Sequence, residues 1–152
     1  MQAQGIALLA PLTVGAGATL CTIVIHGLVL IAVVHFIRRE ERLAFVGVNF
    51  WIDVVIVALV ASFGLAAHLV EIAVWAVLFM GCGEFRDFAT AYYHSAVNYT
   101  TLGYGDLIMS ARWRMLGPLE AANGMVMFGV TTAMVIGVIQ RLLQARFPDL
   151  KD

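Results

Sequence analysis

The chain has 152 residues, of which 62% are hydrophobic and 12% are charged, and its mean hydropathy is +0.92. Soluble domains average about 45–50% apolar and about 25% charged residues, so this composition excludes a water-soluble enzyme as well as a disordered protein. Nine basic residues stand against ten acidic ones, and this formal net charge of -1 leaves no basic surface for nucleic acid.

The first long uncharged run, Ala18 to Ile37, predicts a transmembrane helix, because about 20 apolar residues span the roughly 30 Å hydrocarbon core of a bilayer. Upstream, Pro11, Gly15 and Gly17 interrupt a milder apolar stretch, so we expect residues 1–16 to form an interfacial lead-in. This lead-in is not typical of a signal peptide, because no positively charged segment precedes the apolar run.

A second apolar run extends from about Val46 to Gly83 and predicts one long, tilted helix. At about 1.5 Å per residue it exceeds an upright span, and its only turn signal is an isolated Gly64. His68 and Glu71 are three residues apart and share a face of this helix. We expect a hydrogen-bonded pair that supports the following segment, although ionisable groups in a membrane are also candidates for function.

A polar insert from Glu84 to about Leu116 precedes a third apolar run, which Gly117-Pro118 opens and which ends near Leu143. Within the insert, residues 88–99 predict a short, aromatic-rich helix that cannot span the membrane. Irregular backbone at membrane depth is tolerated only where protein or a water-filled cavity surrounds it. The predicted fold is therefore an all-α membrane protein with three transmembrane helices, and with a re-entrant helix and loop between the second and the third.

Basic residues set the expected orientation of these helices. Six of the nine lie in the 38–42 cluster and near the C-terminus, which share one side of a three-helix arrangement. Because cytoplasmic loops carry an excess of Lys and Arg, we expect this side to be cytoplasmic. The N-terminus and the insert would then lie outside.

The stretch after Thr100 carries glycine at alternate positions, Gly103 and Gly105. Glycine adopts positive φ without a steric clash, so such a segment can turn successive carbonyl groups to one side. Several chains around an axis would then present stacked rings of oxygen atoms to a cation. The partial negative charge at the C-terminus of the preceding short helix favours the same cation.

The sequence Thr-Thr-Leu-Gly-Tyr-Gly-Asp at 100–106 resembles the potassium-channel signature Thr-Thr-Val-Gly-Tyr-Gly-Asp, and the order of elements is similar over about residues 50–143. The resemblance implies a homotetramer, since each chain supplies one loop, and a filter that conducts K⁺. The implied K⁺ ligands are the Thr101 hydroxyl and the backbone carbonyl groups of Thr101, Leu102, Gly103 and Tyr104. The residues implied to support the filter are Gly105, Asp106, Thr100, Val97, Tyr93 and His94.

Two positions depart from the family pattern. Leu102 replaces the usual valine, and Val97 stands where some members carry a glutamate that pairs with the filter aspartate.

On the third helix, Gly129 and Gly137 belong to a stripe of small residues that allows close helix approach or a hinge. The candidates for cavity lining or gating are Met127, Thr131, Gly129 and Gly137.

Three segments follow from this interpretation: residues 1–45 as lead-in and first helix, 46–144 as pore domain, and 145–152 as a short cytoplasmic tail. The first helix has no arginine series, so a voltage sensor is not expected, and the tail is too short for a ligand-sensing domain. The expected partners are K⁺, membrane lipid and further copies of the chain, in a plasma membrane of bacterial type. A non-conducting or regulatory subunit of another channel and a weakly selective cation channel are the alternatives.

Overall fold

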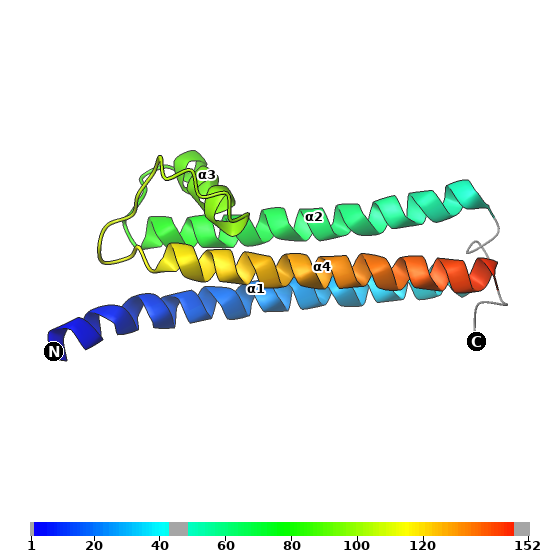
Figure 1. Cartoon of the computed structure of the whole chain (residues 1–152), viewed down its shortest axis with the longest axis horizontal. Coiled ribbons are helices and arrows are strands. Elements are labelled where there is room, and N and C mark those ends of the chain that lie inside the picture. Colours follow the sequence, from blue (N-terminus) through cyan, green and yellow to red (C-terminus); the bar gives the residue numbers. More distant parts are fainter. Residues whose placement is uncertain (1, 43–48, 148–152) are drawn as a thin grey trace.

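The computed structural model describes residues 2–42 and 49–147. These residues contain four helices: α1 (Gln2–Arg42), α2 (Phe50–Gly81), α3 (Phe88–Tyr99) and α4 (Leu116–Arg146). The three long helices run side by side, and the short α3 packs on α2 and α4 at one end of the bundle (Figure 1). Each long helix contains a segment long and apolar enough to cross a membrane. The prediction of an all-helical membrane protein with three spans is therefore confirmed for the described residues.

α1 differs from the prediction, because the expected interfacial lead-in is part of one helix that continues through Pro11. Membrane helices tolerate proline where neighbouring helices or hydroxyl side chains compensate for the lost hydrogen bond. A buried stripe faces α2 and α4 along most of the helix. Its residues are spaced by three or four positions, or by seven between the fifth and the sixth, and they are Pro11, Gly15, Ala18, Thr22, His26, Val33 and Ile37. This packing holds the N-terminal turns against α4, where a Cβ on Gly15 would lie 2.9 Å from Leu119.

α2 is one long helix, as predicted, and begins where the Asn49 side chain accepts a hydrogen bond from the Trp51 amide at 3.0 Å. The predicted start at Val46 lies outside the described residues. α4 begins at Leu116, with Pro118 in its first turn as predicted, and continues to Arg146. A proline has no amide hydrogen to lose in a first turn, where that group has no partner within the helix.

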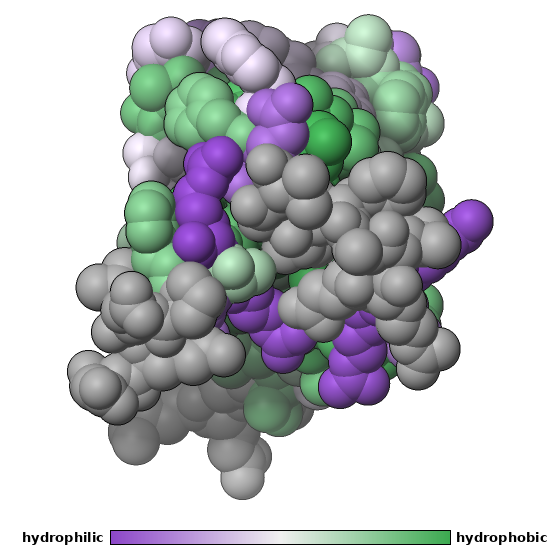
Figure 2. All heavy atoms as spheres, turned by 90° about the vertical axis from the view of Figure 1, so that its right-hand side faces the viewer, coloured by the Kyte–Doolittle hydropathy of each residue, from purple (hydrophilic) through white to green (hydrophobic). Residues whose placement is uncertain are grey.

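The two ends of the bundle differ in character. α3 and the start of α1 lie at one end, whereas the ends of α1 and α4 and the start of α2 lie at the other (Figure 1). Figure 2 looks onto this second end, where hydrophilic residues interrupt the apolar surface. Arg146 of α4 pairs there with Asp53 of α2 at 3.5 Å. The predicted placement of the N-terminus and the insert on one side of three spans agrees with this arrangement.

Candidate functional site

α3 is a short helix with both of its ends defined by local hydrogen bonds. The Asp87 carboxylate accepts from the Thr90 amide at 2.8 Å, and this hydrogen bond lowers the pKa of Asp87. At the other end the Thr100 amide and hydroxyl both donate to the carbonyl of Ala96, at 3.1 and 2.7 Å. The predicted helix 88–99 is confirmed, and its last carbonyl groups point toward the Thr-Leu-Gly-Tyr-Gly-Asp loop.

Two long helices hold α3 through its polar side chains. The Ser95 hydroxyl lies 2.8 Å from the carbonyl of Ile72 in α2 and also contacts the buried Glu120 carboxyl of α4. The Tyr99 hydroxyl donates to Glu71 of α2. These contacts confirm that Glu71 supports the short helix, and Tyr99, which the sequence analysis missed, is the residue that receives this support.

The closest approach in the site lies between α4 and the end of α3. A Cβ added to Gly124 would lie 2.1 Å from the carbonyl oxygen of Tyr99, a distance that real Cβ atoms essentially never show. Glycine is therefore required there. The sequence analysis missed Gly124, because glycine inside a helical run gives no sign of which backbone it faces.

The loop that follows α3 alternates in backbone conformation. φ is +60° at Thr101, +59° at Gly103 and +73° at Gly105, so the prediction of positive φ at the two glycines is confirmed. Thr101 is a β-branched residue in the left-handed region, which costs about 1–3 kcal/mol and persists only where the surrounding structure enforces it. Alternation of this kind turns successive carbonyl groups toward one side of the strand.

Hydrogen bonds of the loop engage its amide groups and leave its carbonyl oxygens available. The Thr101 amide donates to Asn98 at 2.8 Å, and the Leu102 and Gly103 amides donate to the Val97 carbonyl at 2.9 and 3.2 Å. Within residues 2–42 and 49–147, no hydrogen bond ends on a carbonyl of residues 101–104. Leu102 and Tyr104 are 55% and 65% exposed in the single chain, so this loop lies on an open face.

Two predicted support residues lie behind the loop. The Tyr93 hydroxyl donates to Asp106 at 2.7 Å, and this hydrogen bond raises the pKa of Tyr93. His94 is buried between the rings of Phe79 and Phe85, and its Nε2 lies 2.9 Å from the amide nitrogen of Asn98. Burial lowers the pKa of His94. The lowered pKa favours the neutral imidazole, whose Nε2 then accepts a hydrogen bond from the side-chain amide of Asn98.

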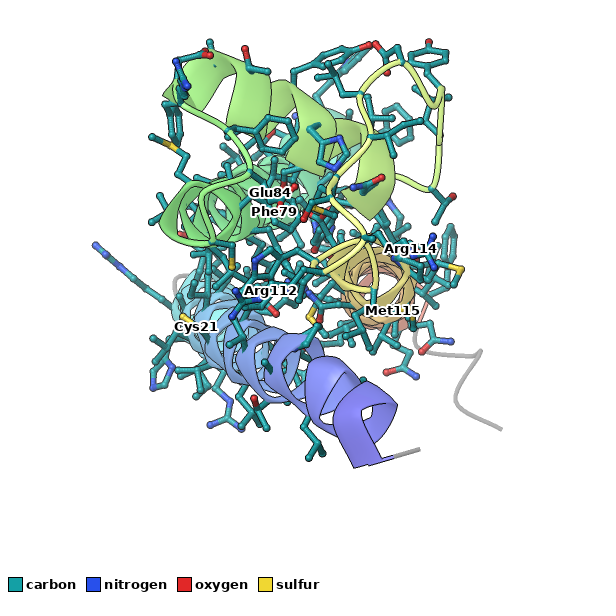
Figure 3. The ribbon with its side chains drawn as sticks, turned by 90° about the vertical axis from the view of Figure 1, so that its left-hand side faces the viewer. Cys21, Phe79, Glu84, Arg112, Arg114 and Met115 are labelled. Atoms are coloured by element: carbon teal, nitrogen blue, oxygen red, sulfur yellow. The ribbon has the colours of Figure 1, made fainter. Side chains whose placement is uncertain are left out.

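A further contact, missed in the sequence, joins the two ends of the insert. The Glu84 carboxylate accepts from the amide and the hydroxyl of Ser110, at 2.7 and 2.5 Å. Figure 3 faces this end of the bundle and shows Glu84 there together with Arg112 and Arg114 on the segment before α4. Charge-assisted bonds of this kind fix the path of the chain around the loop.

The candidates on α4 separate into two groups. Met127 is 4% exposed and packs with Trp75 and Tyr99, and the Thr131 hydroxyl lies 3.1 and 2.9 Å from imidazole nitrogens of α1 and α2. Both side chains make contacts inside the protomer, and the expectation that they line a cavity between chains stays a prediction. Gly129 and Gly137 lie on the other side, where an added Cβ would meet nothing within 4 Å.

Comparisons with known proteins identify the family. A family model described as an ion channel matches residues 55–141, which is more than half of the chain and includes α3, the loop and most of α2 and α4. No curated protein and no solved structure matches the chain. The family match confirms the predicted resemblance, and the chain belongs to this family of ion channels.

Proposed function

We propose that this member of the ion channel family forms a homotetrameric, potassium-selective channel. The observation that carries the proposal is the alternation of left-handed backbone at Thr101, Gly103 and Gly105, directly after the C-terminal end of α3. Oxygen ligands without formal charge can replace the hydration shell of K⁺ when they are held in rings around an axis. The carbonyl groups of residues 101–104 and the Thr101 hydroxyl are the proposed ligands.

The proposed number of four copies rests on the resemblance to potassium channels and on the single loop of each chain. Each chain has one such loop, and closed rings of ligands need several of them around a common axis. The exposed Leu102 and Tyr104 side chains support this proposal, because neighbouring protomers would cover them. In the assembly the C-terminal ends of four α3 helices would point toward the ions, and their partial negative charge would favour a cation.

The proposed orientation places the α3 end of the bundle outside and the Arg38–Arg42 end in the cytoplasm. The excess of basic residues at the second end supports it. Arg39 and Arg86 are exposed at opposite ends, and the native cysteines, Cys21 and Cys82, can be replaced by serine. With a membrane-impermeant thiol reagent on intact cells, we expect labelling of Arg86→Cys and not of Arg39→Cys. The reverse pattern would contradict the orientation.

The test of conduction and selectivity is K⁺ and Na⁺ flux in liposomes that contain only this chain. Gly103 has φ +59°, and a side chain in this region costs about 1–2 kcal/mol per subunit. We expect Gly103→Ala to insert and assemble but to lose K⁺ flux or its selectivity over Na⁺. Leu102→Val is the matched control, because valine leaves the backbone carbonyl unchanged and is the usual residue of the family pattern, and it should keep selective flux.

Three results would refute the proposal. Selective flux in Gly103→Ala equal to that of the wild type would mean that these carbonyl groups are not the filter. A wild-type chain that assembles but conducts neither ion would favour a non-conducting subunit of another channel. Equal K⁺ and Na⁺ flux through the wild type would indicate a weakly selective pore.

A further inference from the structure

Side chains from all four helices meet in one buried cluster below the end of α3. α1 contributes His26, α2 contributes His68 and Glu71, α3 contributes Tyr99 and α4 contributes Thr131. His26, His68 and Glu71 are 2%, 3% and 0% exposed. Within the described residues α1 and α3 do not pack against each other directly, and Glu71 contacts a side chain of each.

The contacts in this cluster form a closed ring. Glu71 contacts His26 Nδ1 at 2.9 Å through one carboxyl oxygen and the Tyr99 hydroxyl through the other. The Tyr99 hydroxyl also lies 3.1 Å from His68 Nδ1. The Thr131 hydroxyl completes the ring, 3.1 Å from His26 Nε2 and 2.9 Å from His68 Nε2. Each of these five contacts needs one hydrogen atom between its two polar atoms.

The neutral side chains do not supply enough hydrogens for this ring. Thr131 and Tyr99 bring one hydroxyl hydrogen each, and each neutral imidazole brings one more, whereas an ionised Glu71 brings none. Four hydrogens are therefore available for five contacts. In one of the contacts two acceptor atoms would face each other without a hydrogen between them, in a buried site. One additional proton removes this conflict, because an imidazolium donates from both of its nitrogen atoms.

The charge balance of the cluster also calls for one additional proton. A buried carboxylate is stable only when a positive charge or hydrogen bonds compensate for its lost hydration. The ion-pair partners of Glu71 among the described residues are His26 and His68, at 2.9 and 3.4 Å. One imidazolium beside one carboxylate leaves the cluster neutral. We propose that His26, His68, Glu71, Tyr99 and Thr131 form a proton-binding site that holds one shared proton on its histidines.

The proton has two equivalent positions in this ring. With the charge on His26, the Thr131 hydroxyl donates to His68 Nε2, and with the charge on His68 it donates to His26 Nε2. The other contacts are satisfied in both arrangements. The ring centroids of the two histidines are 5.2 Å apart, and the ring of Phe128 packs against His68 with a centroid distance of 4.3 Å.

Within residues 2–42 and 49–147, each helix brings few ionisable groups to the cluster. α1 faces it with His26, α2 with His68 and Glu71, and α3 with Tyr99. α4 adds Glu120, whose carboxyl group contacts Ser95 of α3. Loss of the shared proton at alkaline pH would therefore leave an uncompensated carboxylate beside Tyr99, which lies two residues before the first proposed ion ligand.

Glu71→Gln is the decisive variant, because an amide has the same shape and donates one hydrogen in place of the missing one. The ring then closes with both histidines neutral. The measurement is solid-state NMR of the protein with ¹⁵N-labelled histidine in lipid bilayers. The sample pH is set above the range in which histidine ordinarily titrates. We expect one imidazolium per chain in the wild type and none in Glu71→Gln. His35→Gln is the control, since His35 is exposed on α1 and contacts only its own helix, and it should keep the signal.

Neutral histidines in the wild type, or an imidazolium that persists in Glu71→Gln, would overturn the proposal. Two imidazoles and a carboxylate are also a donor set for Zn²⁺, so metal bound stoichiometrically in the purified protein would overturn it as well. A second readout rests on the proposed function: flux should be lost at alkaline pH in the wild type and not in Glu71→Gln. Absence of flux in both would count against the proposed function, while the NMR count would still decide the proton site.

Discussion

The tight contact between Gly124 and the last residue of α3 gives the strongest test of how the site is held. A methyl group at position 124 would lie 2.1 Å from the carbonyl oxygen of Tyr99 and 3.0 Å from its carbonyl carbon, whereas ordinary contact begins at 3.4 Å. Both obstacles are backbone atoms, which cannot rotate away as a side chain would. In the variant Gly124→Ala, α3 and α4 must therefore move apart.

The expected magnitude follows from two opposing effects. Alanine is a better helix former than glycine and would stabilise α4 by about 0.5–1 kcal/mol. Overpacking of a tight interior costs about 1–3 kcal/mol and occasionally more, and a clash with backbone belongs at the upper end of this range. The clash prevails, and in an assembly of four chains it occurs four times. We expect a lower thermal midpoint of the assembly and a loss of flux.

The matched control is Gly17→Ala, also inside a long helix, where the added methyl group meets nothing within 4 Å. It should retain the wild-type midpoint or raise it slightly. The assay is the fraction of detergent-solubilised assembly that survives heating, measured by size-exclusion chromatography, with flux in liposomes as the second readout. If Gly124→Ala melted and conducted like Gly17→Ala, the contact between α4 and the end of α3 would not exist as described.

Three further predictions concern the surroundings of the loop. Tyr93→Phe removes the 2.7 Å hydrogen bond to Asp106, and we expect ion flux to become unstable in time or less selective for K⁺. Tyr92→Phe is the control, because the Tyr92 hydroxyl donates to the Leu69 carbonyl at 3.2 Å and not to the loop, and it should leave the flux and its selectivity unchanged. Glu84→Gln weakens the tie to Ser110, so we expect faster proteolysis of residues 107–115 in liposomes, while Asp87→Asn should not increase it. Burial lowers the pKa of His94, so the unfolded chain binds more protons than the folded one below the ordinary histidine range, and stability should fall on acidification. His94→Gln should flatten this decline in the thermal midpoint, and an unchanged pH dependence would contradict the assignment.

The parts of the fold that the sequence predicts are those decided by local patterns. The lengths of the apolar runs indicate three spans, because the bilayer fixes how many residues a span needs. The bounds of α3 follow from Asp87, which caps the helix, and from the alternating glycines, which cannot continue it. The positive φ of Gly103 is equally local, since glycine relieves the steric limit by itself.

The parts that the sequence does not predict depend on which surfaces meet. Pro11 reads as a break in a helix, yet packing of the buried stripe of α1 on α4 maintains the helix through it. Nothing in the sequence around Thr101 indicates positive φ. Its left-handed backbone is enforced by the hydrogen bonds that the backbone amides of residues 101–103 donate to carbonyl groups at the end of α3. His26 is a single polar residue in an apolar run, and its pairing with Glu71 joins positions 45 residues apart.

The role of α1 follows from the polar groups that it covers. α1 precedes the residues that match the channel family, yet Thr22 and Asn123 exchange hydrogen bonds across its contact with α4, at 2.9 and 3.1 Å. His26, one turn further along the same face of α1, lies 2.9 Å from the Glu71 carboxyl group of α2. Without α1 these groups would face lipid, where each unsatisfied polar group costs several kcal/mol. α1 is therefore an integral part of the bundle around α2 and α4 rather than an appended anchor, and a change in its position would reach the loop through Glu71 and Tyr99.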